Sequence, residues 1–336
     1  MIKKRNLDPS LLGWLMNVTG LGPGIGDVHY LVSPTSAYYS FLRDDLKQET
    51  SKIHFTLQDG EDALVTGRND CLLVFPMGLD VDTEVDWDKS NTHMIGLGGP
   101  NVGGDHSEPN VALYSDNIAT VQILDISGNN CIFKNVNILN AGANAACLFA
   151  VKLNGYGNWF ENCGIKGTMT TENCAVAGAG SLQIAGGGMY PVFKDCQIGQ
   201  DVWGNRTTAN SGVIEFNSSA RPNGGDFINC RILSVGDDAN CAMVRVASAF
   251  SIGRGWRFDN CIFSHFDGNA SGVTDLARVF YTPSTAVQRE IIHLHNCMAI
   301  GVDEWQDDDD NVVVADMPIV GVGGGLAVNP TAPSGT

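Results

Sequence analysis

The sequence predicts an all-β protein, a parallel β-helix in which short strands stack coil upon coil. Three observations support this prediction. A short motif recurs six times, an alternating apolar segment precedes each copy, and the composition is typical of turn-rich β structure. Of the 336 residues, 40 are glycine and only 17% are charged, too few to cover many exposed helix faces. Hydrophobic residues make up 43% of the chain, which is enough for a large core.

The recurring motif reads aromatic or large apolar, any residue, Asn or Asp, Cys, any residue, apolar. Copies occupy residues 133–138, 160–165, 193–198, 227–232, 258–263 and 294–299, the first with Val136 in place of Cys and the last a weaker match. Successive Cys positions, counted from Val136, are 27, 33, 34, 31 and 36 residues apart. A period of this length is typical of solenoid proteins.

A second apolar segment lies upstream of each motif. These segments are residues 121–123, 151–153, 182–184, 214–216, 244–246 and 277–279, and each alternates inward and outward residues as a half-buried strand does. A Gly/Ser/Asn-rich link and another short strand, ending in the motif's aromatic residue, complete each repeat. Three short strands per repeat predict one coil of a parallel β-helix.

The Asn or Asp of each motif is expected to form a corner between two strands. One residue of such a corner takes the left-handed conformation, which Asn and Asp tolerate better than other non-glycine residues. Stacked amides can also hydrogen-bond along the solenoid axis. The expected ladder consists of Asn135, Asn162, Asp195, Asn229, Asn260 and Asn296.

The Cys after each corner is expected to point inward as a small buried thiol. The expected column consists of Cys163, Cys196, Cys230, Cys261 and Cys297. Disulfides between neighbouring coils are the rival interpretation, since coils about 4.8 Å apart bring Cα atoms within bridging distance. Five thiols cannot all pair, and parallel side chains are poorly oriented for bridging. No Cys-x-x-Cys pair occurs, so the sequence predicts no cysteine metal site.

The pattern divides the chain into four parts. We expect an extended arm at 1–26, an N-terminal cap at 27–70, about eight coils at 71–322 and a tail at 323–336. The cap includes helical spacing over residues 38–46, with Thr35 or Ser36 as the N-cap. The N-terminus lacks the features of a secretory signal, so we expect folding in the cytoplasm of the producing cell. No apolar stretch is long enough to span a membrane.

Charge narrows the classes of partner. The formal net charge of −17 disfavours nucleic acid and anionic membranes. The arm differs from the rest, because it combines basic and apolar residues: Lys3, Lys4, Arg5, Leu12, Trp14 and Leu15. Such a segment either folds back on the cap or docks on another subunit or protein. We take these six residues as the predicted docking site.

Catalytic chemistry on a β-helix requires carboxylates on adjacent coils of one face. One predicted outward column holds a single acid: Lys152, Gln183, Glu215, Arg245 and Arg278. The column before the corner is mixed in sign: Lys134, Glu161, Lys194, Ile228, Asp259 and His295. We expect exposed surface ladders with a Glu215–Arg245 pair. A catalytic alternative uses Glu215 and Arg245 with Asp201, or with Asp237 or Asp238.

Metal and cofactor sites are not predicted. His293 and His295 share a strand face without an evident third ligand. The acidic segment 303–310 lacks the glycine of a compact Ca²⁺ loop. We expect no cofactor and no metal.

With these patterns in view, the chain resembles the pectin-lyase-like right-handed parallel β-helix superfamily over residues 65–320. The opening at 70–78, followed by 93–98, is similar to the start of many β-helix proteins of tailed bacteriophages. The resemblance implies a right-handed solenoid. The superfamily includes polysaccharide lyases, glycosidases, tailspikes and non-catalytic virion decorations, so the fold does not decide the function.

We expect a structural virion protein of a tailed phage, a capsid decoration or projecting fibre or spike held by its arm. A homotrimer is expected by analogy with related phage proteins, and an enzyme is the less favoured class. The alternative is a tailspike-type depolymerase, a glycosidase or lyase acting on host surface polysaccharide. A third hypothesis is a carbohydrate-binding module that uses exposed Trp159, Trp203 or Trp256.

Overall fold

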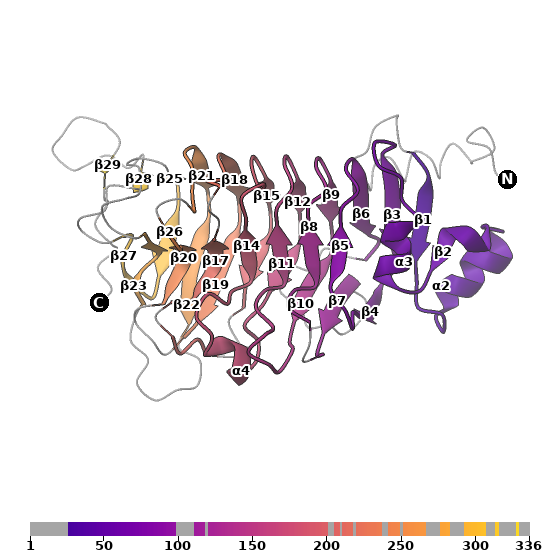
Figure 1. Ribbon diagram of the computed structural model, residues 1–336, viewed down its shortest axis with the longest axis horizontal. Helices are drawn as coiled ribbons and strands as arrows, with labels where there is room; N and C mark the ends of the chain where they lie inside the picture. Colours follow the sequence, from indigo (N-terminus) through magenta and orange to yellow (C-terminus); the bar gives the residue numbers. More distant parts are fainter. Residues whose placement is uncertain are drawn as a thin grey trace.

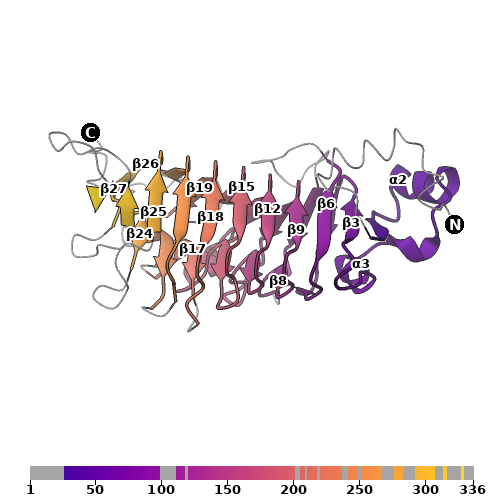
Figure 2. The ribbon, with the colours of Figure 1, turned by 90° about the horizontal axis from the view of Figure 1, so that it is seen from above.

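The chain folds as a right-handed parallel β-helix in this computed structural model, as the sequence predicts (Figure 1). The structure describes residues 26–98, 111–117, 120–200, 205–208, 210–217, 220–236, 241–248, 251–266, 276–282, 292–306, 313–315 and 327–328. Three sheets of largely parallel strands run along the long axis, and each coil between residues 70 and 281 contributes one strand to each sheet in turn (Figure 2). No helix in these ranges is long and apolar enough to cross a membrane.

Sheet A is the strand row before the corners. Its order is β2 (Ile53–His54), β1 (Val28–Leu31), β3 (Asp70–Val74), β6 (Thr92–Gly96), β9 (Ile132–Lys134), β12 (Trp159–Glu161), β15 (Val192–Lys194), β18 (Gly225–Ile228), β21 (Trp256–Asp259), β25 (Ile292–His295), β28 (Val313–Ala315) and β29 (Ala327–Val328). The last pair, β28 and β29, is antiparallel.

Sheets B and C form the other two sides. Sheet B follows the corners and contains β4 (Met77–Asp80), β7 (Val111–Ser115), β10 (Asn137–Asn140), β13 (Gly164–Lys166), β16 (Gln197–Gly199), β19 (Arg231–Val235), β22 (Ile262–Phe266) and β26 (Met298–Ile300). Sheet C contains β5 (Val85–Trp87), β8 (Leu124–Ile126), β11 (Val151–Leu153), β14 (Leu182–Ile184), β17 (Gly212–Phe216), β20 (Ala242–Val246) and β24 (Phe280–Tyr281). A separate pair joins β23 (Leu276–Arg278) to β27 (Val302–Glu304).

Two of the expected sheet C strands are displaced. The strand expected at 121–123 is β8, three residues later, and that expected at 277–279 divides into β23 and β24. Ile123 and Leu124 are both fully buried, so the alternation fits either of two overlapping windows. The hydrogen-bond register selects the second, because Leu124 pairs with Val151 of the next coil.

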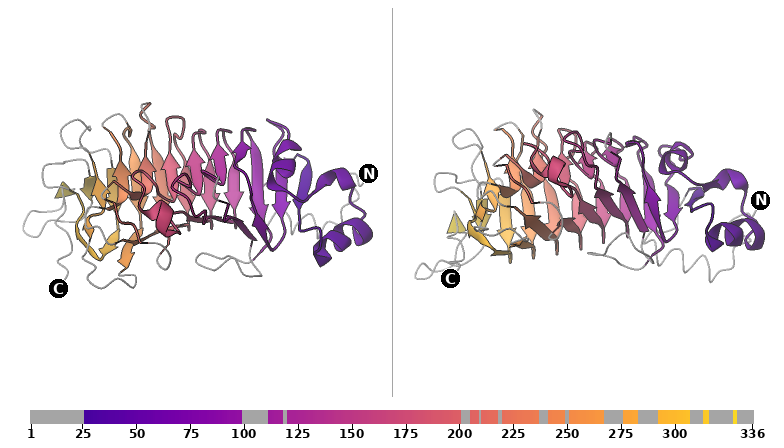
Figure 3. Two further views of the ribbon diagram at one scale, coloured as in Figure 1. Left: turned by 60° about the horizontal axis from the view of Figure 1, so that its bottom comes forward. Right: turned by 90° about the horizontal axis from the view of Figure 1, so that it is seen from below.

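The helical segments lie at the N-terminal end, apart from the short α4 (Thr171–Cys174) beside the coils (Figure 3). They are α2 (Ala37–Ser40), a π-helical turn at Phe41–Asp45, a 3₁₀ turn at Thr50–Lys52 and α3 (Leu57–Asp62). The helix predicted over 38–46 is thus present, with Ser36 at its N-cap. The same region also supplies β1 and β2, which extend sheet A past the first coil.

The corner ladder is present as predicted. All six corner residues have positive φ, between 48° and 56°. The Asn162 amide donates to Asn135 Oδ1 at 2.8 Å, and the same bond recurs from Asn229 to Asp195, Asn260 to Asn229 and Asn296 to Asn260. Asp195 has no amide hydrogen, so no equivalent bond links it to Asn162. The ladder is therefore interrupted at one step.

The interior on the two sides of each corner is equally regular. Phe133, Phe160, Phe193, Phe227 and Phe258 stack with centroids 4.5–4.8 Å apart and interplanar angles of 4–14°. Each aromatic pair of this kind adds about 0.5–1.5 kcal/mol beyond the burial of its area. The five column cysteines follow the corners, and all ten cysteines of the chain are free, which excludes the disulfide interpretation.

Each column thiol contacts a carbonyl of the preceding coil. Cys163 Sγ donates to Phe133 O at 3.4 Å, and Cys230 Sγ donates to Phe193 O at 3.3 Å. Burial raises the pKa of the Cys196 thiol well above its usual range. Because four of the five column sulfurs are buried, they act as packing atoms and weak hydrogen-bond donors.

Replacing Asp195 by Asn should repair the ladder. The new amide can donate to Asn162 Oδ1 and still accept from Asn229, so we expect stability to rise by about 0.5 kcal/mol, the low end for a half-exposed hydrogen bond. Urea unfolding of wild type and Asp195→Asn measures the difference. Asp195→Ala is the control and should be destabilising, because Ala neither accepts from Asn229 nor tolerates the left-handed corner. An Asn variant no more stable than wild type would contradict this account.

Candidate functional site

The outer face of sheet C carries the residues closest to a catalytic arrangement. Strand register aligns one outward residue from each coil in a single column: Asp86, Asp125, Lys152, Gln183, Glu215, Arg245 and Tyr281. The sequence-based column was wrong at its C-terminal end and incomplete at its N-terminal end. Arg278 lies on β23, and Tyr281 takes its place. Asp125 was missed because its strand was expected three residues too early, and Asp86 was missed because no strand was predicted over residues 85–87.

Three carboxylates converge at the N-terminal end of this column. Oxygens of Glu84, Asp86 and Asp125 all lie within 4.8 Å of one another. Lys152 Nζ lies 2.5 Å from Asp125 Oδ2 and neutralises it. Partial burial raises the pKa of Glu84, and the nearby Asp125 carboxylate adds to that effect. The cluster thus places a carboxyl with a raised pKa within 4.8 Å of two further carboxyls, an arrangement suited to acid–base chemistry.

Glu215 does not lie on an exposed ladder. Its side chain is 0% exposed, and Arg245 Nη1 lies 3.0 Å from its Oε2, so the predicted pair is present but buried. Burial raises the pKa of Glu215 to about 8, although Arg245 opposes that shift. A substrate in solution therefore cannot reach this carboxyl.

A second buried guanidinium lies beside Glu215. Arg206 is 1% exposed and donates to Ser211 O at 2.9 Å and Ala242 O at 2.8 Å. These bonds hold the guanidinium at the start of β17 and β20, where its positive charge, like that of Arg245, opposes the raised pKa of Glu215. Asp201, Asp237 and Asp238, the proposed partners of Glu215, lie outside the described residues.

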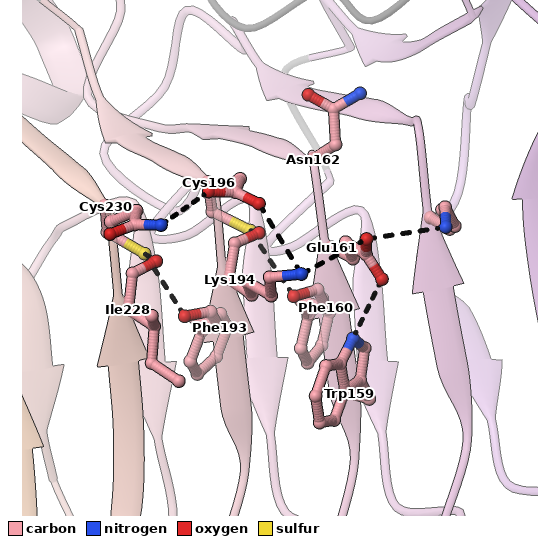
Figure 4. Close-up of polar contacts among 12 residues, drawn as sticks. Trp159, Phe160, Glu161, Asn162, Phe193, Lys194, Cys196, Ile228 and Cys230 are labelled. Carbon is pink, nitrogen blue, oxygen red and sulfur yellow. Dashed lines mark hydrogen bonds and ion pairs between the residues drawn. The ribbon is translucent and has the colours of Figure 1, made fainter. Parts of the chain in front are cut away.

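The column before the corner is a mixed-charge ladder, as predicted. Glu161 lies between two lysines, 3.4 Å from Lys134 Nζ and 3.7 Å from Lys194 Nζ (Figure 4). The indole of Trp159 donates to the other Glu161 oxygen at 3.4 Å. Half-exposed pairs of this kind contribute little to stability, about 0–1 kcal/mol each. The arrangement holds no pair of acids on adjacent coils.

The remaining predicted site residues have different outcomes. Trp159 is exposed on sheet A, whereas Trp256 is fully buried and its indole donates to Pro222 O at 3.1 Å, so Trp256 cannot bind a glycan. His293 and His295 share an exposed face of β25. Trp203, residues 307–310 and the arm residues Lys3, Lys4, Arg5, Leu12, Trp14 and Leu15 lie outside the described residues.

Comparison with known proteins identifies the fold. A pectin methylesterase from Erwinia chrysanthemi is similar with a TM-score of 0.58 at 12% identity, over 93% of this chain and 94% of that one. A pectin methylesterase in complex with a hexasaccharide gives 0.55 at 12% identity, over 91% and 92%. At identities this low the similarity shows a shared right-handed parallel β-helix fold and nothing about activity. No protein-family model and no curated protein matches the chain.

The buried Glu215 should make stability depend on pH. A carboxyl whose pKa is raised to about 8 binds its proton more tightly in the folded state than in the unfolded chain, where the value is near 4.5. Its contribution is complete below pH 4.5 and is lost as the pH rises towards 8. We expect the free energy of unfolding of wild type to fall between pH 5 and 8 relative to Glu215→Gln, measured by urea titration at each pH. Parallel curves for the two proteins would rule out a raised pKa at this site.

Proposed function

We propose that the chain is a structural protein of a tailed-phage virion, a capsid decoration or a projecting fibre or spike. The observation that carries the proposal is the stacking of Phe rings over five successive coils and of thiols over five, which makes a stiff rod without disulfides. A solenoid in which every coil packs only on its neighbours is suited to projecting from a surface. The resemblance of residues 70–78 and 93–98 to phage β-helix openings supports the same proposal.

The thiol chemistry suits synthesis in a host cytoplasm and later exposure outside the cell. Nine of the ten cysteines are buried, and Cys297 is partly buried. Burial raises the pKa of Cys174 to about 12, so the thiolate form of this residue is scarce at neutral pH. A fold that neither needs nor forms disulfides is indifferent to the change of redox compartment.

Attachment is assigned to the N-terminal arm, residues 1–26, with other virion proteins as partners and a homotrimer as the favoured assembly. The net charge of −17 disfavours binding to packaged nucleic acid. The arm's basic and apolar residues supply both electrostatic and apolar contacts for a protein surface.

Purified particles provide the test. We expect the chain in gradient-purified virions of the phage that encodes it, and rod-shaped density at fixed positions in cryo-electron microscopy. A variant lacking residues 1–26 should keep its β-sheet circular dichroism spectrum but should stay in the unbound fraction of the gradient, apart from the virions. Virions that contain none of the chain would overturn the proposal.

A polysaccharide-cleaving enzyme is the second candidate, and the Glu84–Asp86–Asp125 cluster favours it. Glu84 can protonate a glycosidic oxygen, and Asp86, which has no ion-pair partner among the described residues, can attack or activate water. A separation below 5 Å is closer to the spacing of retaining glycosidases than to the wider spacing of inverting ones. Glu215 and Arg245 are not part of this candidate site, because Glu215 is buried.

Reducing-end assays on capsular and lipopolysaccharide substrates test the second candidate. If the cluster is catalytic, Glu84→Gln and Asp86→Asn should each lower the rate by roughly 10²–10⁴-fold. Asp88→Asn is the matched control, an exposed carboxylate at the end of the same strand and outside the cluster, and should act as wild type. Absence of new reducing ends across the panel, or full activity in both cluster variants, would eliminate the enzyme.

A further inference from the structure

A hollow on the outer face of sheet A is a second place where the surface is shaped for a ligand. Its volume is about 550 Å³, and its lining includes Tyr190, Asn223, Gly224, Asp226, Arg254 and His293. Small-ligand sites are usually about 300–1,000 Å³. The hollow lies on a different side of the solenoid from the carboxylates of sheet C, and neither proposed function uses it.

The hollow forms because Tyr190 on one coil lies next to glycines, Gly224 and Gly255, on the two coils that follow. Tyr190 lies in one loop, and its backbone N–H bonds to the next coil at Asn223 O and Gly224 O. A Cβ at Gly224 would lie 2.6 Å from the Tyr190 ring, so the ring can rest on this coil only because the residue is glycine. Gly255 continues the row on the next coil, where a Cβ would lie 3.7 Å from the Gly224 Cα. The phenol ring of Tyr190 therefore forms one wall of the hollow.

Exposed aromatic rings continue along the same edge. Tyr190 is 53% exposed and Tyr156, one coil earlier, is 49% exposed, and their ring centroids are 5.5 Å apart in an edge-on contact. Trp159, on the same coil as Tyr156, is 37% exposed. Tyr190 holds its position with a left-handed backbone, φ 52°, which a large residue adopts at a cost. Exposed, closely grouped rings on one surface are typical of ligand-binding faces.

Polar groups face the ring across the hollow. The Asn223 side-chain oxygen accepts from the Arg254 backbone at 3.3 Å, so the amide NH₂ of Asn223 can donate elsewhere. Asp226 accepts from Arg257 Nε at 3.0 Å, which neutralises that carboxylate. Arg254 is exposed and has no ion-pair partner among the described residues. In a chain of net charge −17, the uncompensated charge of this hollow is therefore positive.

We propose that the hollow beside Tyr190 binds an anionic oligosaccharide, with a sugar ring against Tyr190 and an acidic group on Arg254. Sugars combine an apolar C–H face, which packs on an aromatic ring, with hydroxyls that need donors and acceptors at fixed places. Asn223, His293 and Asp226 supply these groups. The guanidinium provides bidentate hydrogen bonds to a carboxylate or phosphate. Tyr156 and Trp159 extend the surface for further sugar units.

Titration calorimetry with the full chain tests the proposal. The acidic probes are tetragalacturonate, tetramannuronate and sialyllactose, and the neutral probe of matched size is cellotetraose. We expect saturable binding of at least one acidic probe, at least about tenfold tighter than cellotetraose, because one charge-assisted contact contributes about that factor. Absence of binding by all three acidic probes, or equal binding of acidic and neutral probes, would overturn the proposal.

Variants locate the site. Tyr190→Asn removes the ring but keeps a residue that tolerates the left-handed backbone, and Arg254→Ala removes the cation. Each should weaken binding about tenfold or more, whereas Tyr190→Phe should bind as wild type. Arg231→Ala is the matched control, an exposed arginine on sheet B, and should leave binding unchanged. Wild-type affinity in both Tyr190→Asn and Arg254→Ala would place any binding elsewhere and refute the site.

Discussion

The left-handed corner that follows six strands of sheet A, from β9 to β25, is the constraint on which the rest of the structure depends. Six consecutive coils turn there with nearly the same φ, 48–56°. Because each turn is equivalent, the aromatic residue before it and the thiol after it fall directly over those of the neighbouring coil. The Phe stack, the thiol column and the charged ladder at Glu161 are consequences of this one repeated conformation. Parallel hydrogen bonding alone fixes the spacing between coils, and the corner fixes the register.

Sequence reasoning predicted what repeats and failed where repetition is weak. The corner motif carries an Asn or Asp and a Cys at fixed positions, so the ladder, the free thiols and the mixed column at Glu161 could be read directly. The strand β8 has only three residues, and Ile123 and Leu124 are both fully buried, so periodicity does not show which of them begins the strand. That ambiguity hid Asp125, and Asp86 lies on a strand for which no repeat was recognised. The burial of Glu215 and the Tyr190 hollow depend on loops whose paths no local pattern specifies.

The faces of the rod differ in character because only the inward residues are constrained by stacking. On sheet C, charged side chains neutralise one another across coils, as Lys152 does for Asp125. On sheet A, the loop before β15 carries Tyr190, whereas the loops before β18 and β21 carry Gly224 and Gly255, and this difference opens a hollow. A rigid scaffold with independently variable faces is compatible with a structural role and with a recognition role in the same molecule.

The ladder also has a direction. Every corner amide donates towards the N-terminal end, from Asn296 to Asn260 and from Asn260 to Asn229, and the thiols donate the same way, from Cys261 to Phe227 O. The side chains of a finished corner therefore present acceptors to the next coil, whereas its backbone N–H donates the opposite way, as from Asn135 to Glu161 O. Since a ribosome delivers the chain from the N-terminus, each emerging coil meets side-chain acceptors that are already in place. The polarity of the side-chain bonds matches the order of synthesis, so the solenoid can grow in one direction as it is made.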